Sequence, residues 1–367
     1  MKLLPRLLQS RKNDRTKHLE KEQRKLGVLR AGSTGMLSEE GEIAGACHRV
    51  SHLRSKGIEV DPPTDQAYIM FELGYANEDV IYKQIVDTLA PGESVLREEE
   101  IPISWKTSNG TLVTGRPDIV ICRGPTKEDE NVLEIILSKD NPRAFPGDKV
   151  TRALMVPVTG IELKSVHSLW TARDVLFGLK PKLPNLAQAA HYMWKLGLSE
   201  YKLMYKSYSQ LGQGMAGNEW ITKMFPKPGE PGSEYVDYTE SERNPGKYTI
   251  KHIKQFEIVY DLSFDKSGRL RYKPEGIDSW TSTVITRKSI EDYFELVSKI
   301  ESTKDLGPRP SAVDAVGKKL SYTQCKYCPL NKTCTTFQSK GYDKWMEEVL
   351  VTINLNKNTK DPNRTDR

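Results

Sequence analysis

The stretches that decide the fold are Gly115-Arg116-Pro117-Asp118-Ile119-Val120-Ile121 and Gly160-Ile161-Glu162-Leu163-Lys164-Ser165. Each places an acidic residue in a short apolar run, which is typical of a buried strand. Because side chains alternate across a strand, Glu162 and Lys164 point to the same side. Carboxylates on two neighbouring strands can hold Mg²⁺ or Mn²⁺, and the metal lowers the pKa of a bound water. A lysine beside them can orient that water or neutralise charge on a phosphate.

The residues before the Glu-x-Lys triplet favour a buried site over the commoner solvated surface pair. The triplet closes the apolar run from Val156 to Ile161. Pro157 has no backbone N–H, so we expect the strand to begin near or after it. Asp140 and Asp148 are rival partners for the triplet, and Asp118 is preferred because it lies in a strand-like context.

A helix is predicted upstream, over residues 65–89, where apolar residues recur at helical spacing. Pro91-Gly92 ends it. Within it, Gly74 is followed four residues later by Glu78. An ordinary exposed glutamate is the plain alternative for Glu78, and the order of the motifs along the chain favours a role in the site.

A second helix is predicted downstream, over residues 185–197. It places Gln188 and Tyr192 four residues apart, so the two side chains share a face. The plain alternative is a core tyrosine beside a surface glutamine.

The cysteines form a second pattern. Three of the five make a Cys-x₂-Cys-x₅-Cys array, namely Cys325, Cys328 and Cys334. Cys47 lies far upstream and completes a set of four thiols, which suits zinc or an iron–sulfur cluster; the spacing alone does not choose between them. Cys122 ends an apolar run and is expected to be a buried thiol. His48, beside Cys47, is a minor rival ligand.

In this order the motifs resemble the PD-(D/E)XK nuclease superfamily, over roughly residues 40 to 335. The resemblance implies an α/β, restriction-endonuclease-like fold, with a mixed central sheet flanked by helices. It implies that Glu78, Asp118, Glu162 and the Leu163 carbonyl bind one or two Mg²⁺ or Mn²⁺ ions. Related nucleases carry His or Glu four residues after the glycine, and Glu78 gives ligation by oxygen. Lys164 would then position the attacking water.

Two further features of the chain are similar to particular branches of that superfamily. The Gln188-x-x-x-Tyr192 pair resembles a motif of RecB-type nucleases that supports the active site and contacts the DNA strand. Asn185 stands where many relatives have a histidine. One cysteine before the core and three after it resemble the iron–sulfur staple of AddB-type and Cas-four-type nucleases. This favours a [4Fe–4S] cluster at Cys47, Cys325, Cys328 and Cys334, with Zn²⁺ as the alternative.

Composition sets the remaining limits. The chain has 367 residues, 37% of them hydrophobic, and a net charge of +6. Residues 1–30 hold ten Lys/Arg and three Asp/Glu, so this arm carries +7 and the remainder −1 (45 basic against 46 acidic). The arm could contact phosphates or be a solvated tail. No apolar stretch approaches the ~18 residues of a membrane span, and no signal peptide is visible. A reducing cytoplasm is the expected location, which also makes a disulfide reading weak.

The expected organisation is a basic arm at 1–35, a nuclease domain at 36–345 and a polar tail at 346–367, of which residues 354–367 are expected to be disordered. The domain would contain an insertion at 123–150 and the cysteine segment at 321–336. Gly32 to Gly35 is expected to be a flexible join and residues 210–245 a long loop. The other predicted elements are strands at 94–106, 111–122, 156–164 and 201–209, a helix at 171–178, a hairpin turning at 265–268, and a helix from Ser289 to Ile300 capped by Ser289.

We therefore expect a metal-dependent DNA nuclease, acting as an exonuclease in recombination, repair or replication. Two other interpretations stay open: a nuclease-like fold that binds nucleic acid without cutting it, and a zinc-stapled endonuclease. The expected partner is DNA with free ends or a single strand, and no membrane. No helicase motif is visible in the sequence, so a helicase or recombination partner would be a separate chain. The sequence does not fix an oligomeric state.

Overall fold

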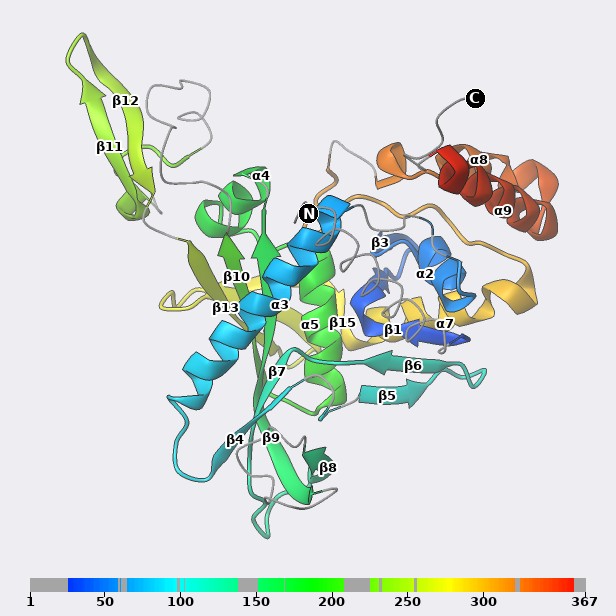
Figure 1. Cartoon of the computed structure of the whole chain (residues 1–367), viewed down its shortest axis with the longest axis horizontal. Helices are drawn as coiled ribbons and strands as arrows, with labels where there is room; N and C mark the ends of the chain where they lie inside the picture. The colour runs from blue at the N-terminus through cyan, green and yellow to red at the C-terminus, as the bar shows by residue number, and fades with distance from the viewer. Residues whose placement is uncertain are drawn as a thin grey trace, which may run out of the picture.

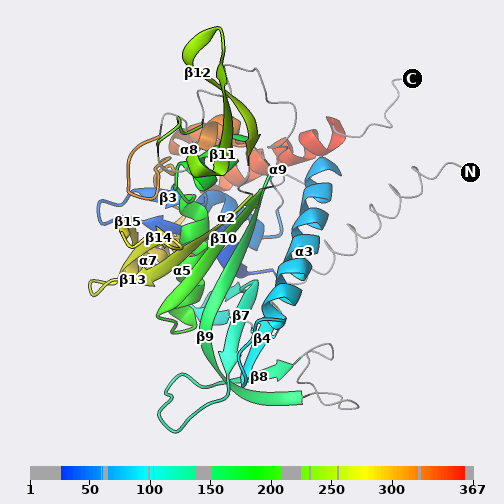
Figure 2. The same ribbon diagram turned by 90° about the vertical axis from the view of Figure 1, so that its left-hand side faces the viewer.

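The computed structural model shows a mixed α/β chain in which a large twisted sheet lies between helices (Figures 1 and 2). It describes residues 26–58, 60, 65–97, 100–101, 103–137, 151–167, 169–207, 225–230, 233–253, 256–320 and 324–359. The predicted mixed sheet flanked by helices is confirmed.

The largest sheet among the described residues has eight strands, in the order β15-β14-β13-β10-β9-β7-β4, with β8 paired to β9. Its strands are β4 (Glu93–Arg97), β7 (Ile119–Arg123), β8 (Leu133–Leu137), β9 (Thr151–Val166), β10 (Glu200–Ser207), β13 (Glu257–Phe264), β14 (Arg269–Pro274) and β15 (Thr281–Thr286). Strand β9 runs antiparallel to β7 and parallel to β10. The long central strand β9 therefore borders both the acidic stretch before β7 and the strand that follows α5.

Two long helices cover opposite faces of this sheet (Figure 2). Helix α3 (Asp65–Val86) buries Ile81 against Ile119, Ile161 and Leu163 on one face. Helix α5 (Leu183–Lys195) packs on the other face, where its buried residues join the main core. Because side chains alternate, Asp118, Glu162 and Lys164 belong to the α5 face.

Smaller elements surround the sheet. They are a three-stranded sheet of β1 (Val28–Arg30), β6 (Leu112–Gly115) and β5 (Ile103–Lys106), the hairpins β2 (Gly35–Leu37) with β3 (Ile43–Gly45) and β11 (Val236–Ser241) with β12 (Asn244–Ile253), and the helices α2 (His48–Ser55), α4 (Leu169–Ala172), η2 (Arg173–Phe177), α7 (Arg287–Thr303), α8 (Asn331–Lys340) and α9 (Tyr342–Thr359). Short 3₁₀ turns are η1 (Ala31–Ser33), η3 (Ser233–Tyr235) and η4 (Gln324–Tyr327).

The beginning and the end of the described chain pack together. Leu53 of α2 lies in one apolar cluster with Ile300 of α7, Leu330 and the fully buried Trp345 of α9. His52 Nε2 is 2.9 Å from the Tyr342 hydroxyl, and a ring nitrogen of His48 hydrogen-bonds the Leu306 carbonyl oxygen. This contact makes the N-terminal segment part of the folded body.

Two of the predicted strands are each broken in two. The predicted strand at 94–106 is β4 and β5, in different sheets, and that at 111–122 is β6 and β7. Asp118 therefore lies just before a strand and not within one. Pro117 lacks a backbone N–H, which explains why the ladder stops there.

Pro157 does not mark the start of β9, contrary to the prediction, because the strand begins at Thr151. The pairing of β7 with β9 shifts register at this point: Ile121 pairs with Thr159, whereas Cys122 pairs with Pro157. Such a bulge accommodates a residue that cannot donate to the ladder. The N-terminal part of β9 pairs with β8, so the predicted insertion at 123–150 adds a strand.

Several local predictions need correction. The predicted flexible join at Gly32–Gly35 is instead a tight turn. Thr34 in this turn is buried, and its hydroxyl hydrogen-bonds the Ala31 carbonyl and His191. Helix α7 begins earlier than expected: Thr286 caps it, and Ser289, the third helical residue, completes a capping box with Thr286. Strand β11 lies within the predicted 210–245 loop, and α9 continues to Thr359, within the expected tail.

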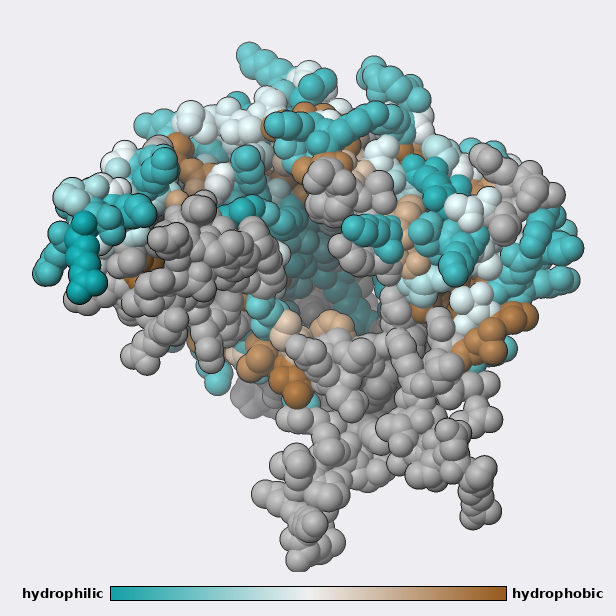
Figure 3. Space-filling view, turned by 90° about the horizontal axis from the view of Figure 1, so that it is seen from above, coloured by the Kyte–Doolittle hydropathy of each residue, from teal (hydrophilic) through white to brown (hydrophobic). Residues whose placement is uncertain are grey.

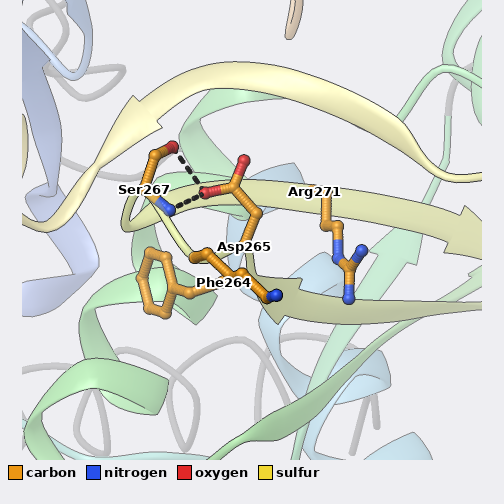
Figure 4. Close-up of a pocket in the computed structure, with 5 residues that line it drawn as sticks. Phe264, Asp265, Ser267 and Arg271 are labelled. Atoms are coloured by element: carbon orange, nitrogen blue, oxygen red, sulfur yellow. Dashed lines mark hydrogen bonds between the residues drawn. The ribbon is translucent and has the colours of Figure 1, made fainter.

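The predicted hairpin at 265–268 is confirmed between β13 and β14. Asp265 Oδ1 accepts hydrogen bonds from Ser267 N at 2.8 Å and from Ser267 Oγ at 2.6 Å (Figure 4). The pocket drawn there is lined by Phe264, Arg271 and the turn residues Asp265 to Ser267, and the carboxylate of Asp265 serves the turn itself. In the described residues, no helix has the length and apolar character that crossing a membrane requires.

Candidate functional site

Asp118 and Glu162 come together because two strands are paired in a fixed register. Ile119 pairs with Ile161 in the antiparallel β7–β9 ladder, so the residue before Ile119 lies beside Glu162 on the same face. Asp118 Oδ2 accepts a hydrogen bond of 2.7 Å from the Leu163 backbone N–H. The predicted pairing of these two acids across neighbouring strands is present.

Glu162 is fully buried, and its two oxygens have different surroundings. Oε1 accepts a hydrogen bond of 2.5 Å from Lys164 Nζ, whose side chain is 25% exposed. Oε2 has no hydrogen-bond partner among the described residues. A buried carboxylate oxygen without a donor is costly, and a bound cation is one of the few groups that satisfies it.

The charges at the site are strongly coupled. Burial, and then the neighbouring Asp118, raise the pKa of Glu162 to about 8. Burial also raises the pKa of Asp118. For Lys164, burial alone would lower the pKa, but the two carboxylates outweigh it and raise it. Two acids and one ammonium thus share a region that is poor in water.

Glu78 lies on α3, within electrostatic range of Glu162. It is half-buried, and its charge contributes to the raised pKa of Glu162. Within the described part of the chain, however, no three His, Cys, Asp or Glu side chains are close enough together to hold a metal ion. The pair Asp118 and Glu162 is formed directly, and Glu78 lies within electrostatic range.

Close packing does not require a glycine at position 74. A Cβ added at this position would meet only Ser165 Oγ, at 3.9 Å, which is an ordinary contact. Space alone therefore does not explain the glycine in the predicted Gly-x-x-x-Glu motif.

Gln188 and Tyr192 contact one another, with Gln188 Nε2 donating to the Tyr192 hydroxyl at 3.2 Å. Tyr192 is only 2% exposed, so its ring packs inside the protein. Burial and then the charge of Glu162 raise the pKa of this tyrosine. The expected supporting role of the pair fits this geometry, whereas a direct contact of Tyr192 with a DNA strand does not.

Strand β10 adds two tyrosines that the sequence reasoning missed. Tyr201 and Tyr205 pair with Gly160 and Lys164 in the parallel β9–β10 ladder. The Tyr205 hydroxyl accepts from the backbone N–H of Lys182 and from Asn185 Nδ2, both at 3.0 Å. The hydrogen bond to the Tyr205 hydroxyl gives Asn185 a structural role. The sequence held one clue to Tyr201: a glycine inside a strand, here Gly160, often marks the close approach of another group.

The four predicted cluster cysteines are only partly assembled. Cys47 precedes α2, and the nearby Cys328 and Cys334 thiols add to the burial that raises its pKa to about 11. No disulfide joins any of the five cysteines, and the described residues contain no group of three that could bind a metal as arranged. Cys122 is buried, as predicted. His48 Nε2 hydrogen-bonds the Leu306 carbonyl oxygen, which leaves the buried Nδ1, without a hydrogen-bond partner among the described residues, as the nitrogen that could bind a metal.

The rest of the predicted site falls partly outside the described residues. Asp140, Asp148 and the arm at 1–25 lie there. Leu163 is tied to the site through its amide, whereas its carbonyl was the predicted ligand. The face seen in Figure 3 lies at the end of the molecule toward which β9 runs, and it has a hollow with hydrophilic residues at its floor.

Comparison with known proteins gives little guidance. No family model matches this sequence, and no curated protein matches it. A solved structure described as "Crystal structure of SSO0001" is similar over 52% of this chain and 70% of that chain, with 14% identity and a TM-score of 0.29. A similarity at that level carries no argument about fold or function.

Proposed function

We propose that this protein is a metal-dependent nuclease with a PD-(D/E)XK-type site that hydrolyses phosphodiester bonds in DNA, and we favour exonuclease action. The observation that carries the proposal is the buried Glu162. It faces Asp118 across the β7–β9 ladder, bonds Lys164 through one oxygen and leaves the other oxygen without a donor.

The donor set suits Mg²⁺ or Mn²⁺. Magnesium is commonly held by one or two carboxylates together with waters and substrate phosphate, so Asp118 and Glu162 are sufficient protein ligands. Glu78 is the third candidate, because its charge already reaches Glu162. When bound, such an ion supplies a water of lowered pKa and a positive charge beside the phosphate.

The chain's own groups have separate tasks in this proposal. Lys164 holds its ammonium at the edge of the site, where it can orient the attacking water and offset charge that develops on phosphate. The Leu163 amide fixes Asp118. Gln188 holds the Tyr192 hydroxyl beside the carboxylates, and Tyr192 in turn fills the space next to them.

The iron–sulfur staple is a second part of the proposal. It is supported by the presence of Cys47 beside Cys328 and Cys334, where the N- and C-terminal segments share an apolar cluster. Cys325 would complete the set. A [4Fe–4S] cluster or Zn²⁺ would tie these segments together, and no electron transfer is needed for hydrolysis.

The test is digestion of end-labelled single- and double-stranded DNA with Mn²⁺, with Mg²⁺, and with chelator. We expect cleavage only with metal, and a loss of at least about 10²-fold in Lys164→Ala, in the range for removal of one charge-stabilising group. Lys206→Ala is the matched control, since Lys206 lies on the neighbouring β10, is 23% exposed and pairs with Glu257.

Two results would contradict the proposal. Metal-dependent cleavage that survives in Lys164→Ala would reject this site as the catalytic one. Nucleic-acid binding without any cleavage by the parent chain would favour the alternative, a nuclease-like binding protein.

A further inference from the structure

Tyr201 has a buried hydroxyl that no other group of the described chain satisfies. Its side chain is fully buried, and the hydroxyl forms no hydrogen bond within the described residues. An unpaired hydroxyl in a protein interior is costly, because it is hydrogen-bonded to water in the unfolded chain. A phenylalanine would fill the same space without this cost, so the hydroxyl itself needs an explanation.

The register of the sheet places the Tyr201 ring against the strand that carries Glu162. Tyr201 pairs with Gly160 in the parallel β9–β10 ladder. The ring occupies the space that a side chain at Gly160 would need, since a Cβ there would lie 2.1 Å from Tyr201 Cε2. Gly160 and Glu162 are two residues apart on β9 and therefore share a face. The ring thus lies on the face of β9 from which the Glu162 side chain extends.

The Tyr201 hydroxyl also lies within electrostatic range of both carboxylates. Burial, and then the charges of Glu162 and Asp118, raise the pKa of Tyr201, so its phenol stays neutral. A neutral hydroxyl can donate one hydrogen bond and accept others. The carboxylate oxygen Glu162 Oε2 is buried and unpaired as well within the described residues. Two unsatisfied polar groups of complementary chemistry therefore border the same site.

A cation held by two carboxylates needs further support from the protein. Asp118 and Glu162 are the carboxylates that the β7–β9 ladder brings together. Mg²⁺ prefers octahedral geometry, and it usually keeps several waters when one or two carboxylates bind it. The charge of the ion polarises these waters, so they are strong hydrogen-bond donors and need acceptors nearby. The oxygen of a buried, neutral hydroxyl is such an acceptor.

We propose that the Tyr201 hydroxyl is an outer ligand of the metal site, which accepts a hydrogen bond from a water on the cation that Asp118 and Glu162 hold. Its own O–H can donate to the Glu162 carboxylate and orient it toward the ion. Tyr201 is thus a positioning residue and has no contact with the phosphate. The inference rests on the metal site of the proposed function, and it does not depend on which bond that site hydrolyses.

Metal binding by the full chain without DNA tests the role of Tyr201. The chain is titrated with Mn²⁺ at a fixed pH, and electron paramagnetic resonance measures the free ion. Glu162→Gln shows which part of the binding belongs to this site. We expect Tyr201→Phe, which keeps the ring, to weaken that part about tenfold, the lower end of the loss that follows removal of a group behind a metal ligand.

Tyr260→Phe is the matched control. Tyr260 is also a fully buried tyrosine of this sheet, and it lies on β13 beside β10. Its hydroxyl, unlike that of Tyr201, donates a hydrogen bond to the Val175 carbonyl oxygen. Removing the Tyr260 hydroxyl should leave the Mn²⁺ affinity unchanged.

Urea denaturation separates the two tyrosines by the direction of the effect. In buffer freed of divalent ions, Tyr201→Phe should unfold at the same urea concentration as the parent or at a higher one, because it loses a hydroxyl without a partner. Tyr260→Phe should unfold at a lower concentration, because it loses a hydrogen bond. Added Mn²⁺ should then raise the urea midpoint of the parent and of Tyr260→Phe more than that of Tyr201→Phe.

Three results would overturn the role of Tyr201: an unchanged Mn²⁺ affinity in Tyr201→Phe, an equal loss of affinity in Tyr260→Phe, or a lowered urea midpoint of Tyr201→Phe in the ion-free buffer. The last would mean that the hydroxyl already has a partner when no ion is bound. Mn²⁺ binding that survives intact in Glu162→Gln would refute the proposed metal site, and the role of Tyr201 with it. Binding that needs both Glu162 and Tyr201, in a chain that cuts no DNA, would refute the nuclease function alone.

Discussion

Glu162 is the residue where burial and charge conflict most directly. Its carboxyl is removed from water, faces a second acid and leaves one oxygen without a donor. A proton relieves this conflict, which is why its pKa is raised to about 8. A divalent cation relieves it as well, so the proton and the metal compete for the same oxygen.

That competition gives a prediction for metal binding. Below pH 8 the metal-free Glu162 carboxyl is mostly protonated, and a ligand carboxylate must be deprotonated. We therefore expect Mn²⁺ binding at pH 6.5 to release close to one proton, and its affinity to rise up to about tenfold per pH unit until pH approaches 8. Titration calorimetry in two buffers of different ionisation enthalpy measures the release. Binding at pH 6.5 without proton release would contradict the raised pKa.

Single residues were predictable from the sequence where their chemistry is unusual for their surroundings. Asp118, Glu162 and Lys164 stand out as charges in apolar runs, and the β7–β9 register brings them together. Tyr201 and Tyr205 do not stand out, because tyrosine in a strand is an ordinary core residue. Only the register of β10 against β9 places them next to the charged groups.

At the scale of elements, two glycines let aromatic rings lie against the strands of the site. A Cβ at Gly160 would come within 2.1 Å of the Tyr201 ring, and one at Gly115 within 2.5 Å of the Tyr192 ring. Both rings lie on the same face as Glu162. The close packing of β9, β10 and α5 around the carboxylates therefore depends on glycine, which has no side chain, at positions 115 and 160.

Gly160→Ala should lower the free energy of unfolding by about 1–3 kcal/mol, because the fully buried Tyr201 ring has no room to move aside. Urea denaturation measures this change. Gly124→Ala is the control: a Cβ there meets nothing within 4 Å, so its effect should stay within about 0.5 kcal/mol. Equal stability of the two variants would show that β9 and β10 are less tightly packed than described.

Element positions were predictable from hydrophobic periodicity, but strand limits and partners were not. Apolar residues recur at helical spacing in α3 and α5, and both helices lie close to the positions that this spacing predicted. The 94–106 and 111–122 strands were drawn too long, because nothing local shows that β5 and β6 leave the main sheet. Pro157 was misleading, since a bulge in the β7–β9 ladder accommodates it.

At the scale of the whole molecule, buried histidines join the first described helix to the last part of the chain. Burial lowers the pKa of His48 and of His52 to about 4, although each has a hydrogen-bond partner in the C-terminal region. Both imidazoles are therefore neutral in the folded protein at pH 7.

Acid should lower the stability of the packing between α2 and the C-terminal region. The folded pKa of each histidine lies below the unfolded value of about 6.5, so the unfolded chain binds more protons between pH 6.5 and pH 4. Stability is fully present above pH 6.5 and is lost as pH falls toward 4, by up to roughly 1.4 kcal/mol per pH unit and histidine. Urea midpoints followed by tryptophan fluorescence measure the loss.

Glu162 acts in the opposite direction, because its raised folded pKa favours the folded state as pH falls from 8 toward 4.5. The experiment is therefore done in Glu162→Gln, which removes that contribution. A flat profile between pH 7 and pH 5 in this variant would mean that the two histidines are not held neutral.

The proposed staple predicts a further whole-molecule effect. Cys328→Ser should lose bound iron and its brown colour, and should melt at a lower temperature, because the two ends lose their cross-link. Cys122→Ala is the control, since Cys122 lies in the main core, whereas Cys328 and Cys334 pack against a different apolar cluster. Metal analysis of the purified chains decides: zinc in place of iron would identify the alternative cofactor, and equal iron in both variants would count against the staple.

The packing of α2 against α7 and α9 also has a consequence for how this protein is made. Leu53 is synthesised well before most of the residues that bury it, which lie beyond residue 299. Such distant contacts close slowly and leave apolar surface unprotected in the meantime. A nascent chain therefore exposes Leu53 until α7 and α9 have been synthesised, and a fragment that ends before α7 should aggregate when it is expressed.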